Sequence, residues 1–101
     1  MTHFIKISIS LSFLILSTAV FAAPPAKEIV CRTCHGEAGA KTLLPSYPKL
    51  NGQNKAYLAQ VLTAYKKGER KGGMAQIMAA QAAMLSDAEI AELAEYYSSQ
   101  P

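Results

Sequence analysis

The chain has few of the residues that usually hold a small domain together. It contains no tryptophan, and Phe4, Phe13 and Phe21 all lie near its N-terminus. Its two cysteines, Cys31 and Cys34, are too close in sequence for a disulfide between them to close a stabilising loop. A framework of several disulfides is therefore excluded. With so little to build a core, the chain is expected to fill it with something other than its own side chains.

Strong charge of one sign is also missing. Ten basic residues face seven acidic ones, which gives a formal net charge of +3. Basic residues do not form a stripe with interleaved aromatics, which is the usual signature of a nucleic-acid surface. We therefore predict no nucleic-acid partner.

The first 22 residues have the order of a secretory signal peptide. Lys6 provides a weakly positive start, residues 7–20 form an apolar stretch, and VFA at 20–22 is a small-residue cleavage site. A membrane anchor would need about 20 strongly apolar residues, and this stretch is shorter and contains serines. We predict a cleaved signal peptide over residues 1–22 and one domain over residues 23–101.

The remaining chain has helical periodicity and no strand pattern. Helices are predicted over residues 26–35 and 54–67, and from Ser86, which opens a capping box. Residues 74–84 are rich in alanine and methionine, and their pattern does not distinguish helix from loop. Residues 36–53 contain three glycines and two prolines and are predicted to form a long loop. The predicted fold class is all-α.

The chemistry of the chain is concentrated in the sequence Cys-Arg-Thr-Cys-His at residues 31–35. C-x-x-C-H is the attachment signal for c-type haem. On a helix, positions i, i+3 and i+4 share one face, so Cys31, Cys34 and His35 point at one object. Each thiol can add to one vinyl group of the porphyrin, and His35 then reaches the iron.

Other uses of two nearby cysteines fit less well. A thioredoxin-type C-x-x-C begins a helix in a βαβ unit, and no strand is predicted here. A zinc site needs further cysteines or histidines, and none remains once His3 leaves with the signal peptide. We predict one covalent haem c, attached through Cys31 and Cys34, whose large apolar surface completes the core.

The second axial ligand of the iron is left open by the residue pattern. His35 is the only histidine of the mature chain, so a bis-histidine haem is excluded. A thioether is a natural soft ligand for haem iron, and three are present: Met74, Met78 and Met84. With both axial positions filled, the remaining chemistry is one-electron cycling between Fe(III) and Fe(II).

Three motifs follow one another in the mature chain: CRTCHG at 31–36, YPKLNGQNKAYLAQVLTAYKKGER at 47–70 and IMAAQAAMLSDAEIAELAEYYSSQ at 77–100. In this order the chain resembles the class I c-type cytochromes, and among them the small bacterial periplasmic electron carriers. The resemblance covers essentially all of residues 23–101. It implies a cytochrome c-like fold, in which a few short helices and long loops wrap one covalently bound haem, and a periplasmic location.

The resemblance also implies which methionine binds the iron. In the proteins that the chain resembles, the ligand lies eight residues before the serine of the LSD motif. That serine is Ser86 here, so the implied ligand is Met78. Many of them carry a second methionine three residues after the ligand, where this chain has Gln81.

Three further residues are expected to support the haem. A ligating histidine almost always donates its other ring N–H to an acceptor. For His35 the resemblance implies the carbonyl of Pro48, in preference to Pro45, and packing of Leu50 against the haem. The guanidinium of Arg70 is expected to pair with a haem propionate.

The predicted function is electron carriage rather than catalysis, with no small-molecule substrate. Transient redox protein partners would meet the protein at the exposed haem edge, and a membrane-bound respiratory complex is the expected donor or acceptor. Two alternatives stay open. One is a haem c module with a labile sixth ligand, acting as a gas sensor or a peroxidase-like enzyme. The other is a haem subunit of a larger oxidoreductase complex, which the short first helix favours.

Because the chain has few large apolar residues for a core, we predict that the protein folds poorly without its haem. A haem-free Cys31→Ala/Cys34→Ala variant should lose most of its helical circular dichroism, because the side chains alone bury too little apolar surface. The measurement is far-ultraviolet circular dichroism of the variant beside the haem-loaded native protein. A near-native spectrum for the variant would contradict the prediction.

Overall fold

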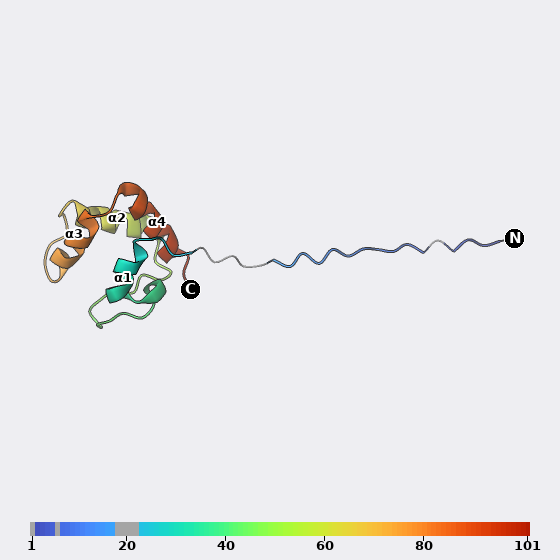
Figure 1. Cartoon of the computed structure of the whole chain (residues 1–101), viewed down its shortest axis with the longest axis horizontal. Coiled ribbons are helices and arrows are strands. Elements are labelled where there is room, and N and C mark those ends of the chain that lie inside the picture. Colours follow the sequence, from blue (N-terminus) through green and yellow to red (C-terminus); the bar gives the residue numbers. More distant parts are fainter. Residues whose placement is uncertain (1, 6, 18–22) are drawn as a thin grey trace.

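The computed structural model describes residues 2–5, 7–17 and 23–101 (Figure 1). Its elements, in chain order, are α1 (Glu28–His35), the 3-10 turn η1 (Glu37–Gly39), α2 (Lys55–Lys66), α3 (Ala75–Ala83) and α4 (Asp87–Ser98). No strand occurs among these described residues, which confirms the all-α prediction. Four helices with long connections agree with the predicted arrangement of a few short helices and long loops.

The N-terminal leader does not pack on the helices. Residues 2–5 and 7–17 are exposed and extended, and Figure 1 shows them apart from the helices. Lys6 and the predicted cleavage site at residues 20–22 lie outside the described residues. Within the described ranges, no helix has the length and apolar character that crossing a membrane requires. The division into signal peptide and domain stays a prediction.

Polar caps determine where α2 and α4 begin. The side chain of Asn54 accepts a hydrogen bond from the backbone N–H of Tyr57 at 2.9 Å and caps α2. Ser86 Oγ accepts from the N–H of Glu89 at 3.1 Å, and Glu89 Oε1 accepts from the N–H of Ser86 at 3.0 Å. This reciprocal pair is the predicted capping box. α4 therefore has a sharply defined start.

The segment that the sequence pattern left open is helical. Residues Ala75–Ala83 form α3, which packs against α2. Ala82 is fully buried on the inner side of α3, whereas Ile77 is about half exposed, at 47%. The periodicity was ambiguous because alanine has little apolar or polar contrast, so only the tertiary contact distinguishes the two faces of this helix.

The core is small and is built around α4. Its buried members are Leu58, Leu85, Ile90, Leu93, Ala94, Tyr96 and Tyr97. Most of these belong to α4, and Leu58 is the member that α2 contributes. The rings of Tyr96 and Tyr97 meet edge to face, with centroids 5.2 Å apart. α4 thus supplies most of the core, α2 packs against it, and α3 packs on α2.

The short α1 lies beside α4 and the core cluster. Lys27, at its start, forms an ion pair with Glu89 of α4 at 3.7 Å, and Cys31 packs against the core cluster. Glu28 is buried, and its carboxylate binds Arg32 one turn later at 2.7 Å. The ion pair of Lys27 and the packing of Cys31 connect the helix that carries the two cysteines to α4 and the core, whereas the Glu28–Arg32 pair lies within α1.

The capping box generates a test of this architecture. Ser86→Ala should lower the free energy of unfolding by about 1 kcal/mol, because it leaves the N–H of Glu89 without its acceptor. Urea unfolding of the haem-loaded protein measures the change. Ser46→Ala, at an exposed loop position, is the control and should behave as the native protein. Equal destabilisation by both substitutions would contradict a specific role for the cap.

Candidate functional site

The two cysteines lie one turn apart on α1 as free thiols, and both are half-buried. Their spacing places them on one side of the helix, as the sequence predicts. The pKa of the Cys31 thiol is raised, chiefly because burial disfavours the thiolate. The sulfur of Cys31 lies 3.5 Å from the carbonyl oxygen of Lys27, to which it donates. The fold therefore holds Cys31 as a neutral, inward-facing thiol.

His35 ends α1 and is buried, with 7% of its surface exposed. Its Nδ1–H donates to the carbonyl oxygen of Pro48 at 2.8 Å. This hydrogen bond determines the tautomer, because the proton on Nδ1 leaves Nε2 with a free electron pair. The same bond limits rotation of the ring, whose centroid is 6.4 Å from that of Tyr47. His35 is thus prepared as a nitrogen base of fixed orientation.

The chain turns sharply at Gly36 to bring the loop back beneath α1. Gly36 has φ +81° and ψ 165°, a region open essentially to glycine alone. A Cβ placed there would collide with the backbone carbonyl of Lys41. The N–H of Leu43 then donates to the carbonyl of Cys34 at 2.9 Å. This close return of the backbone sets the path that carries Pro48 to His35.

Leu50 lies where the loop meets the core. It is half-buried and packs against the core cluster, and its N–H donates to the carbonyl of Gly39 at 2.9 Å. A Cβ on Gly39 would approach the Cβ of Leu50 to 2.7 Å and a ring carbon of Tyr97 to 3.0 Å. The loop is therefore tightly packed against α4 here. The predicted contact between Leu50 and a haem stays a prediction.

The three candidate methionines differ in burial. Met74 and Met84 are 44% and 62% exposed, whereas Met78 is half-buried. Met78 lies one turn before the fully buried Ala82 on α3, so it belongs to the side of the helix that faces the protein. Among the three thioethers, Met78 is the one that the fold directs inward.

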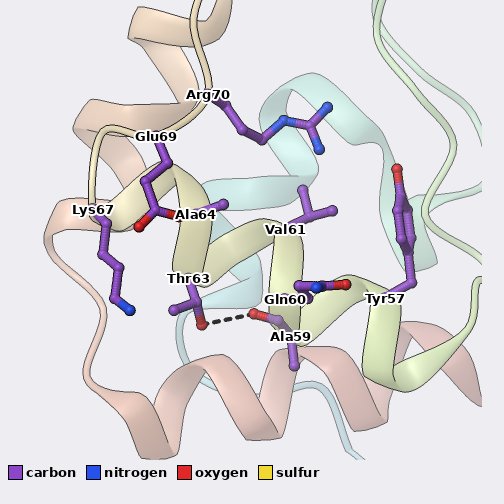
Figure 2. Close-up of a pocket in the computed structure, with 9 residues that line it drawn as sticks. All are labelled: Tyr57, Ala59, Gln60, Val61, Thr63, Ala64, Lys67, Glu69 and Arg70. Atoms are coloured by element: carbon purple, nitrogen blue, oxygen red, sulfur yellow. Dashed lines mark hydrogen bonds between the residues drawn. The ribbon is translucent and has the colours of Figure 1, made fainter.

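Arg70 borders a hollow of about 540 Å³ along α2, shown in Figure 2. Its guanidinium carbon lies 4.9 Å from the centre of the Tyr65 ring. In Figure 2 the side chain extends toward Val61, whereas Lys67 and Glu69 point the other way. Within the described ranges, no carboxylate forms an ion pair with Arg70. The guanidinium is therefore available to an anion, and the predicted propionate contact stays a prediction.

Two residues beside Cys31 were not predicted from the sequence. Glu28 is 1% exposed, and its Oε1 has no hydrogen-bond partner among the described residues; the hydroxyl of Tyr97 is buried and likewise lacks one there. Burial raises the pKa of the Tyr97 phenol, with a further contribution from Cys31. An i, i+4 pair such as Glu28 and Arg32 is usually found on the surface of a protein. The burial of the Glu28 carboxylate therefore could not be predicted from the sequence.

The donor set of this site fits a covalently bound haem. Cys31 and Cys34 offer two free thiols at the spacing that thioether formation requires, and His35, the residue after Cys34, offers Nε2, the ring nitrogen that does not bond to Pro48. Large apolar side chains, among them Val30 on α1 and Tyr57 on α2, remain about half exposed, at 47% and 48%. They are suited to contact with an apolar macrocycle.

The chain is similar in sequence to several known bacterial proteins. Residues 20–96 match the family model described as cytochrome c oxidase, cbb3-type, subunit III. The chain is 48% identical over 79 residues to cytochrome c-554(548) of Halomonas halodenitrificans, which covers 78% of this chain and 94% of that protein. It is 38% identical over 79 residues, 78% of its length, to cytochrome c4 of Pseudomonas aeruginosa. It is 36% identical over 80 residues, 79% of its length, to the thiosulfate dehydrogenase electron acceptor of Thiomonas intermedia.

The relatives differ in length. The aligned part spans nearly all of the Halomonas protein, but only 37% of the Pseudomonas protein and 36% of the Thiomonas protein. The similarity to the longer proteins therefore concerns one part of each of them.

The turn after α1 generates a test of the site. Gly36→Ala should lower the free energy of unfolding of the haem-loaded protein by about 2 kcal/mol or more, because the strained backbone and the collision with Lys41 act together. Gly72→Ala is the matched control, since Gly72 has φ +88° but nothing within 4 Å of an added Cβ. Urea unfolding compares the two. If both variants lose the same stability, the close backbone approach at Gly36 is not a constraint on the site.

Proposed function

The chain belongs to the c-type cytochrome family, and we propose that it is a periplasmic one-electron carrier with His35 and Met78 as axial ligands of its haem iron. Family membership shows that the chain is an electron-transfer protein with a haem c attached at Cys31 and Cys34. The proposed ligation of the iron by His35 is supported chiefly by one observation. The hydrogen bond of His35 to Pro48, at 2.8 Å, leaves Nε2 as the free ring nitrogen.

The haem supplies a one-electron Fe(III)/Fe(II) couple when bound. The role of the Pro48 carbonyl is to keep the His35 ring in place and to make it a better electron donor through Nδ1. A thioether from Met78 favours the ferrous state and raises the reduction potential. With His35 and Met78 both bound, the iron would have no open coordination position for oxygen or peroxide, and the protein would carry electrons rather than catalyse a reaction.

Electron carriage requires a partner that binds briefly. Weak redox encounters use small interfaces. Relatives named as electron acceptors of thiosulfate dehydrogenase support a redox protein as the partner class. We propose a membrane-bound respiratory complex as donor or acceptor. The location outside the cytoplasm rests on the predicted signal peptide over residues 1–22.

The sixth ligand provides the decisive test. Met78→Ala should abolish the weak long-wavelength sulfur-to-iron absorption band of the oxidised protein and allow carbon monoxide to bind the reduced protein, because the thioether is removed. Absorption spectra of the haem-loaded protein in both redox states measure this. Met84→Ala, at a position 62% exposed, is the matched control and should keep the band. Carbon monoxide binding by the native protein at neutral pH would instead support the gas-sensing or peroxidase-like alternative.

A further inference from the structure

The end of α4 holds the loop that carries Pro48. The N–H of Gly52 donates to the carbonyl oxygen of Tyr97, in the last turn of α4, at 2.9 Å. The last carbonyls of a helix have no partner within the helix and need one from elsewhere. A Cβ added to Gly52 would lie 3.4 Å from the backbone oxygen of Gln100, so the loop runs directly against the residues that follow α4. The loop therefore caps α4, and α4 in turn anchors the loop.

Asn51 adds a side-chain contact at the same place. Its Nδ2–H donates to the backbone oxygen of Pro101 at 2.7 Å, which joins positions 50 residues apart in the sequence. A backbone oxygen only accepts hydrogen bonds, so the nitrogen of the Asn51 amide must be the atom that faces it. Asn51 is half-buried, whereas the neighbouring Gln53 is exposed. The side chain of Asn51 thus ties the loop to the segment that follows α4.

The opposite side of the loop is fixed by η1. The N–H groups of Leu50 and Asn51 both donate to the carbonyl oxygen of Gly39, at 2.9 and 3.3 Å. Pro48 has no N–H of its own, so the neighbouring residues must locate its carbonyl. Before Pro48 the loop is exposed over residues 43–46. The firm anchor of the Pro48 carbonyl is therefore the stretch 50–52, which lies between η1 and the end of α4.

We propose that Asn51 is a positioning residue for His35 and acts through the carbonyl of Pro48. This inference rests on the proposed function, because it requires His35 as an axial ligand. With the contact to Pro101 in place, the loop keeps the carbonyl oxygen of Pro48 at 2.8 Å from His35 Nδ1. That hydrogen bond makes the ring a stronger electron donor, which favours Fe(III). Loosening the loop would weaken the bond and so raise the reduction potential.

The test compares Asn51→Ala with the native protein, both loaded with haem. Alanine removes the donor to Pro101 and leaves the backbone hydrogen bonds of the loop. Hydrogen exchange of the His35 Nδ1–H, followed by nuclear magnetic resonance of the reduced protein, should be about fivefold faster, the effect of one ordinary hydrogen bond. A redox titration should show a higher reduction potential. Gln53→Ala, at the exposed neighbouring position, is the matched control and should match the native protein in both measurements.

A second variant keeps the test decisive if alanine disturbs the loop. Asn51→Asp preserves the shape of the side chain, but its carboxylate has no proton to donate at neutral pH. Exchange of the His35 Nδ1–H should again be about fivefold faster. The new charge acts on the iron by itself, so the exchange rate is the quantity compared for this variant.

Two outcomes would overturn the inference. A native exchange rate and a native potential in Asn51→Ala would show that the contact with Pro101 does not reach His35, whatever the variant does to the free energy of unfolding. Equal shifts in Gln53→Ala would show a general effect of altering the loop.

The same spectra separate this inference from the proposed function. A histidine bound to the iron lies over the haem, whose ring current shifts the protons of the imidazole strongly upfield in the reduced protein. Shifted His35 protons, together with native exchange in Asn51→Ala, would remove only the role of Asn51. Unshifted His35 protons in the native protein would remove His35 as the ligand, and the role of Asn51 with it.

Discussion

The hydrogen bond from His35 to the carbonyl of Pro48 is the contact on which the rest of the site depends. It joins the end of α1 to a loop residue 13 positions later, at 2.8 Å. That meeting requires the backbone to reverse at Gly36, where a Cβ would collide with Lys41. Since a protonated Nδ1 is committed to Pro48, Nε2 is the ring nitrogen left to bind a metal. One contact thus couples the path of the loop to the chemistry of the ring.

The same geometry explains how a chain with so small a core can form a cytochrome. Side-chain burial centres on α4, and α1 lies beside it through Cys31 and the ion pair of Lys27 with Glu89. The cysteine-bearing helix is therefore both part of the core edge and the attachment point of the cofactor. A haem tethered twice at that edge extends the apolar interior without requiring further large side chains, which explains why a chain without tryptophan can have this fold.

The sequence predicted most of the fold because its signals are local. The capping box of Ser86, the periodicity of α2 and the C-x-x-C-H spacing each depend on a few neighbouring residues. It could not decide α3, where alanine gives no contrast between faces, and it gave no sign that Glu28 is 1% exposed. Both depend on which surface another element covers.

The two proposed axial ligands are held by different means, and this difference would have consequences for an electron carrier. His35 is restrained from outside its helix, by a carbonyl of the long loop. Met78 belongs to α3, whose main packing partner is α2 rather than the α4 core. A thioether is also flexible, with several rotatable bonds. The iron would therefore have one ligand whose ring is held by the long loop and one whose orientation depends on the packing of α3 against α2.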